Sequence, residues 1–281
     1  MAVSAEVYTR PRSQTRLMVA SAVWGAIIIP LAILSSSFLS IPGAFGAGYF
    51  WLPQIMMVSG VVFFGPWGML AAAVGTFLGG MFAGSPLAIN IGQNPIPAFL
   101  GNTFLFYILW FGYKYKVHIW EGYSNGLAIK VVGGERRPTA EVNWSRVAVT
   151  GIVFALTIVF AVVVGFKLGP YLDAMGLKAW GYPLIFLLTL PWWWVIKQLG
   201  GLRVDGYIVL ALIAVIVSSI ASAALGAFAW QTVGGMGASA WVVVFPGWAL
   251  GDIVAGSLGI PLIWSFADVL ERKGMLWRPL R

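Results

Sequence analysis

The chain has 281 residues, of which 60% are hydrophobic and only 9% are charged, so its composition is not that of a water-soluble domain. It has no cysteine and a single histidine, His118, which excludes disulfides, thiolate metal sites and bis-histidine haem ligation within this chain. It also lacks a phosphate-binding loop of the form GxxxxGK[ST], so it cannot power transport with its own ATPase of that type. We expect an all-α integral membrane protein of the cell membrane, with no cofactor and no catalytic activity.

About eight apolar windows are long enough to be counted as membrane-spanning helices, because a helix pairs its own backbone polar groups in lipid. The second and third windows are short for a hydrocarbon core of about 30 Å, so we expect them to be tilted or partly re-entrant. In chain order the predicted spans are Leu17–Leu39, Tyr49–Phe64, Trp67–Ala83, Ile96–Tyr113, Val147–Phe166, Ala179–Ile196, Tyr207–Trp230 and Trp241–Phe266.

The charged residues predict the orientation of these spans. With a cytoplasmic amino terminus, all of the 17 lysines and arginines except Lys167 and Lys178 lie on the cytoplasmic side, as the positive-inside rule requires. Both termini are then cytoplasmic. The predicted organisation is a cytoplasmic segment 1–16, four spans in 17–113, a cytoplasmic loop 114–146, four spans in 147–267 and a cytoplasmic tail 268–281. Within the loop, the sequence AIKVVGGERRP predicts a small hairpin.

Small residues recur at helical spacing inside the spans, which predicts a glycine-rich, tightly packed bundle. Gly75 with Gly79, and Gly80 with Gly84, form two GxxxG pairs, and Ser218, Ser222 and Gly226 repeat the spacing in the seventh span. Such residues let helix backbones approach closely in lipid. They indicate packing seams, or, alternatively, short helices that leave a pocket on the outer side.

Polar side chains in the apolar windows are the candidate ligand-binding residues. Asn90, Gln93 and Asn94 lie in an outer connection, and Asn102 follows in the fourth span. Gln54 lies early in the second span and faces the same side. Amides both donate and accept hydrogen bonds, so this group suits a neutral or zwitterionic ligand. The alternative is that they cap and turn the chain around Pro95 and Pro97.

Asp252 is the only acidic residue well inside an apolar window. A carboxylate inside a membrane is costly and indicates a functional site, unless an amide or a helix amino terminus pairs with it structurally. Trp248, one turn earlier, completes the predicted site.

The sequence resembles two families of membrane proteins. The first span followed by FFGPWGMLAAAVGTFLGG resembles the substrate-binding S components of energy-coupling factor (ECF) transporters. In that family an alanine pair spaced four residues apart on the first helix docks on the transmembrane coupling subunit. Ala22 and Ala26 match that spacing. The resemblance implies a solute-binding subunit that works with a coupling subunit and ATPases.

The second resemblance is to the MASE1 membrane sensor domain, an eight-span module. FWLPQ, AFLGN and WALGDIVAGSLGIPLI are similar to its tryptophan-proline, GN and W-x-x-GD-x-x-G-x-x-x-x-P features. Such domains usually precede a cytoplasmic signalling domain, and the 14 residues after the last predicted span, 268–281, are too few for one.

These observations favour a subunit that binds a small solute at the outer face and passes it to a separate coupling complex. A sensor module that signals through another chain is the first alternative. A structural accessory subunit of a larger membrane complex is the second. Nucleic acid is not an expected partner, because the membrane topology accounts for the basic charge.

Overall fold

The computed structural model describes residues 14–41, 44–48, 50–114, 129–132, 135–138 and 206–273, together with Met275, Trp277 and isolated positions between 148 and 175. The predicted spans at 147–166 and 179–196 lie almost entirely outside the described residues. The elements are α1 (Gln14–Phe38), β1 (Ser40–Ile41), β2 (Ala44–Gly48), α2 (Pro53–Phe64), α3 (Pro66–Phe82), α4 (Leu87–Gln93), α5 (Pro95–Lys114), β3 (Ile129–Val132), β4 (Glu135–Pro138), α10 (Gly206–Thr232) and α11 (Ser239–Arg272).

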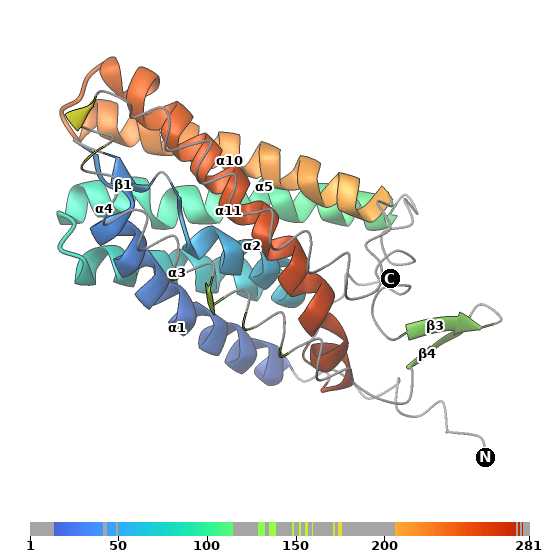
Figure 1. Cartoon of the computed structure of the whole chain (residues 1–281). Helices are drawn as coiled ribbons and strands as arrows, with labels where there is room; N and C mark the ends of the chain where they lie inside the picture. Colours follow the sequence, from blue (N-terminus) through green and yellow to red (C-terminus); the bar gives the residue numbers. More distant parts are fainter. Residues whose placement is uncertain are drawn as a thin grey trace.

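Each predicted span that falls on described residues coincides with a helix (Figure 1). Among the described residues, three helical segments are long and apolar enough to cross a membrane: Gln14–Phe38, Ala211–Thr232 and Ser239–Ile260. This number is smaller than the eight spans predicted. The structure therefore shows a helical protein with three candidate membrane-spanning helices, while the larger count and the orientation stay predictions.

The apolar helix α2 is too short to cross a bilayer upright, and α3, with 17 residues, is at the lower limit of length for a spanning helix. At about 1.5 Å per residue, the 12 residues of α2 rise about 18 Å, against a hydrocarbon core of about 30 Å. Gly65 separates the two helices with φ of 58°, and Pro66 begins α3, where its missing N–H is not needed. A Cβ at Gly65 would also lie 2.5 Å from the ring of Trp277. Glycine is therefore favoured here both by the positive φ and by the close contact with this ring.

The second predicted span begins earlier in the sequence than the helix does. Pro53 is the first residue of α2, and the preceding residues form a short antiparallel ribbon in which β1 pairs with β2. A proline is favoured in the first turn of a helix, which explains this start. The segment between the third and fourth predicted spans also differs from expectation. It was predicted to be an outer connection, and it contains a seven-residue helix, α4. In the loop 114–146, β3 pairs with β4 in antiparallel register at the predicted hairpin.

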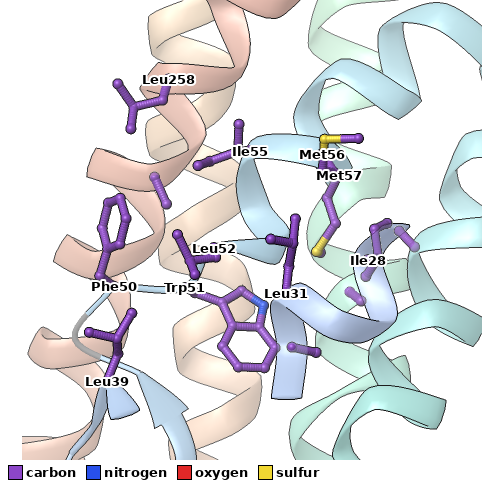
Figure 2. Close-up of a cluster of buried hydrophobic side chains, with 14 of the residues drawn as sticks. Ile28, Leu31, Leu39, Phe50, Trp51, Leu52, Ile55, Met56, Met57 and Leu258 are labelled. Atoms are coloured by element: carbon purple, nitrogen blue, oxygen red, sulfur yellow. The ribbon is translucent and has the colours of Figure 1, made fainter. Parts of the chain in front are cut away.

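The core lies around α2, which packs against α1, α3, α5 and α11. Figure 2 shows one buried cluster in which Leu52, just before α2, and Ile55 of α2 lie between Leu31 of α1 and Leu258 of α11. Trp24 of α1 adds a polar link, since its indole N–H donates to the Met56 carbonyl at 2.8 Å. Every residue of α2 except Val62 is buried. A helix that is apolar on all sides is therefore enclosed by its neighbours.

The helices α1 and α3 pack through small residues. A Cβ at Gly75 would lie 2.7 Å from the Gly25 carbonyl oxygen, and one at Gly79 would collide with the Ala32 side chain. The GxxxG pair of Gly75 and Gly79 is therefore a packing seam, as one of the two sequence interpretations proposed.

The bundle has two distinct ends (Figure 1). At one end lie the start of α1, the turn between α2 and α3, and the last turns of α11; Trp67 bonds Gln14 here at 3.2 Å. The opposite end holds the ribbon of β1 and β2, helix α4 and the connection between α10 and α11. We refer to these as the α1-start end and the α4 end.

Candidate binding site in the helix bundle

The predicted amides of α4 form a hydrogen-bonded network at the α4 end. The Asn90 amide donates to the Phe77 carbonyl of α3 at 3.0 Å, and the Asn94 amide donates to Asn90. The Gln93 amide donates to the Ser85 hydroxyl at 2.9 Å.

Gln93 also accepts a hydrogen bond from a distant helix. The indole N–H of Trp230 on α10 donates to Gln93 Oε1 at 2.9 Å. All three amide residues are buried. Their polar atoms are largely used to hold α4 against α3 and α10, which favours the structural alternative for this group, although Asn94 Oδ1 has no partner among the described residues.

A second polar group lies deeper, where α10 and α11 pack together. Asp252 is 1% exposed, and its Oδ2 accepts a hydrogen bond from the indole N–H of Trp248 at 3.0 Å. The Ser222 hydroxyl on α10 lies close to the same carboxyl group. Asp252 Oδ1 has no hydrogen-bond partner within the described part of the chain. Asp252 thus combines a structural bond with an unused, buried oxygen.

Asn102 of α5 lies at the same level of the bundle. Its neighbour Gly101 faces Ser222, because a Cβ at Gly101 would lie 3.0 Å from the Ser222 Cβ. The Asn102 amide donates to the Ala98 carbonyl at 2.5 Å, and Oδ1 lacks a partner among the described residues. Asn102 therefore presents a buried oxygen on α5, one residue after the glycine that faces α10.

Gln54 of α2 approaches the group from another side. A Cβ at Gly256, one turn after Asp252, would lie 3.3 Å from Gln54 Cγ and 2.8 Å from Val215 Cγ1. Gln54 is 2% exposed, and its Oε1 has no partner in the described residues.

Ser219 completes this group and was not predicted. It lies on α10 one turn after Val215, which contacts Gly256. It also lies one turn before Ser222, which is near Asp252, and Ala223, which is near Trp248. Its hydroxyl is fully buried without a partner among the described residues. The small-residue spacing of this helix was visible in the sequence, but it indicated packing rather than a polar contact. We call Gln54, Asn102, Ser219 and Asp252 the interior oxygen group.

The interior oxygen group lies in the middle of the bundle rather than at an end. Ser219 and Asp252 are near the middle of the candidate membrane-spanning segments Ala211–Thr232 and Ser239–Ile260. Of the surrounding helices, α10 packs against α5 and α11, and α2 also packs against α5 and α11. The predicted site residues therefore separate into a group at the α4 end whose polar atoms, apart from Asn94 Oδ1, are largely hydrogen-bonded, and an interior group in which each residue keeps one oxygen without a partner among the described residues.

The predicted partner-binding residues Ala22 and Ala26 are exposed on α1. They share that side of the helix with Val19, Val23 and Ile27, whereas Gly25 and Ile28 face α3. Lipid and a partner helix are both compatible with such an apolar face.

The described residues contain no group of three or more histidine, aspartate or glutamate side chains placed to hold a metal ion. No protein-family model matches the chain, and no curated protein or solved structure matches it either.

Proposed function

We propose that the chain is a multi-pass membrane protein that captures a small polar solute at the interior oxygen group and passes it to a separate coupling complex. The observation that carries the proposal is the set of buried oxygens on α2, α5, α10 and α11 that have no hydrogen-bond partner among the described residues. Leaving a buried polar group unpaired costs about 1–3 kcal/mol, so a folded protein retains such groups where a ligand supplies the missing bonds.

The location supports the proposal. In membrane transport proteins, polar groups at mid-membrane depth that face the protein interior mark substrate and ion sites. Asn102 and Asp252 both belong to the sequence motifs that resemble the MASE1 membrane sensor domain. Trp248 would position the Asp252 carboxyl, since its indole N–H occupies one of the two carboxyl oxygens.

The test is to purify the protein from native membranes in mild detergent and to identify extracted small molecules and co-purifying proteins by mass spectrometry. We expect one enriched solute in the wild-type protein. Asn102→Ala and Asp252→Asn should each weaken its binding by about 10- to 100-fold, because each removes a buried hydrogen-bond partner worth about 1–3 kcal/mol. Uptake into vesicles that contain the co-purified complex then separates transport from sensing.

The matched control is Thr76→Val, which keeps the side-chain shape and removes a buried hydroxyl that already bonds the Ala72 carbonyl at 2.8 Å. It should leave solute recovery unchanged. Equal recovery from wild type, Asn102→Ala and Asp252→Asn would show that the interior oxygen group does not bind the solute. Recovery of a fixed protein complex without any solute would instead support a structural accessory subunit.

A further inference from the structure

The unpaired atoms of the interior oxygen group are mostly acceptors. The Asn102 amide nitrogen faces the Ala98 carbonyl, which can only accept, so Oδ1 is the atom without a partner in the described part of the chain. The Trp248 indole can only donate and bonds one carboxylate oxygen, and Asp252 Oδ1 has no hydrogen-bond partner among the described residues. Gln54 Oε1 is a third acceptor, and Ser219 adds a hydroxyl that can accept as well. Apart from the Ser222 hydroxyl, which lies close to the Asp252 carboxyl, the described residues therefore offer this group more acceptors than donors.

The described helices that surround the group supply no fixed positive charge to these acceptors. Between Leu17 and Tyr113, and again between Val204 and Glu271, the sequence contains no lysine, arginine or histidine. The helices around the group are drawn almost entirely from these two stretches. A buried carboxylate without a counter-ion is costly, so a positively charged partner would stabilise it strongly.

We propose that the interior oxygen group binds a desolvated monovalent cation. Carboxylate, amide and hydroxyl oxygens are the ligands that hard cations prefer, and a protonated primary amine can donate to the same three acceptors. One carboxylate balances one positive charge, which selects a monovalent over a divalent cation. The inference rests on the site of the proposed function and specifies the charge of what binds there.

The packing around the site favours a compact cation. A Cβ at Gly256 would contact both Val215 and Gln54, and one at Gly101 would contact Ser222. These walls bring four helices close to the group. Two sources share the required chemistry, namely an inorganic ion such as Na⁺ and the ammonium group of an organic solute.

The test is thermal unfolding of the full-length protein in detergent, in NaCl, KCl, methylammonium chloride and choline chloride at equal ionic strength. Relative to choline, we expect at least one of the other salts to raise the melting temperature by on the order of 5 °C at about 100-fold excess over Kd. A rise in NaCl or KCl alone identifies an inorganic ion. A rise in methylammonium chloride alone identifies an organic ammonium group.

Variants locate the effect. Asp252→Asn removes the charge while keeping the shape and should abolish the salt-specific rise; Ser219→Ala should weaken apparent cation affinity about tenfold. Ser36→Ala is the matched control, because Ser36 on α1 is also a buried serine without a hydroxyl partner among the described residues. It should keep the full rise. If Asp252→Asn does not fold, Ser219→Ala and Asn102→Ala provide the comparison.

The same melting temperature in all four salts for the wild-type protein would overturn the cation inference, as would a salt-specific rise that survives Asp252→Asn and Ser219→Ala. After either result, the proposed solute binding is still supported if a neutral solute is recovered by mass spectrometry from the wild-type protein and is not recovered from the Asn102→Ala variant. Conversely, a cation-specific rise without any recovered solute supports the cation site and contradicts solute capture.

Discussion

At the level of single residues, the buried polar side chains differ in whether their bonding capacity is used. Gln93 is bonded at both ends of its amide, to Ser85 and to Trp230, and its side chain links α4 to α10. Asp252, Asn102 and Gln54 each keep one oxygen unbonded among the described residues. Side chains of the first kind stabilise the bundle, whereas those of the second kind are suited to a ligand.

The bond between Trp230 and Gln93 should be measurable as a coupling energy. In a double-mutant cycle with Trp230→Phe and Gln93→Met, we expect about 0.6–1.7 kcal/mol of coupling in the free energy of unfolding, the range found for hydrogen bonds between membrane helices. Unfolding in mixed detergent and denaturant measures it. Trp241→Phe is the matched control, because the Trp241 indole bonds the exposed Gln231. This substitution should reduce the free energy of unfolding much less than Trp230→Phe does. Additive effects of Trp230→Phe and Gln93→Met would mean that the bond contributes nothing.

At the level of elements, close approach between α1 and α3 depends on glycine. A Cβ at Gly79 would collide with the Ala32 side chain, so Gly79→Ala should destabilise the protein by about 1–3 kcal/mol despite the better helix propensity of alanine. Ala32→Gly in the same chain should recover most of the loss. Val74→Leu, at an exposed position of α3, should be neutral. Destabilisation of Gly79→Ala that Ala32→Gly fails to relieve would show that the cost does not arise at this contact.

Helix positions could be predicted from the sequence because long apolar runs have few other solutions in lipid, and the Gly65–Pro66 turn follows from local chemistry. The start of α2 and the existence of α4 were not predicted, because the sequences before Pro53 and Pro95 are apolar enough to read as either span or connection. The candidate site was predicted in part: Gln54, Asn102 and Asp252 stand out as polar residues in apolar windows. Ser219 did not stand out in the sequence, because serine is also a common small residue at helix packing seams. Only the packing of α10 on α11 shows that its hydroxyl is buried.

At the level of the whole molecule, the described basic residues of the helix bundle lie at one of its two ends. Arg16 lies near the start of α1, Lys114 ends α5, and Arg272 and Lys273 lie at the end of α11, all at the α1-start end. The described residues of the α4 end, in 39–52, 83–95 and 230–240, include no charged residue. The positive-inside rule therefore predicts that the α1-start end lies in the cytoplasm and the α4 end outside.

The absence of cysteine from the chain makes this orientation directly testable, because single cysteines can be introduced without removing any. Thr15 at the α1-start end and Ala238 at the α4 end are both exposed. In intact cells, a membrane-impermeant maleimide should label Ala238→Cys, and it should label Thr15→Cys only after the membrane is permeabilised. The unmodified chain provides the background. Labelling of Thr15→Cys alone in intact cells would reverse the orientation and place the α4 end in the cytoplasm. Labelling of both from outside would contradict a bundle that crosses the membrane between its two ends, and with it the solute path through the interior oxygen group.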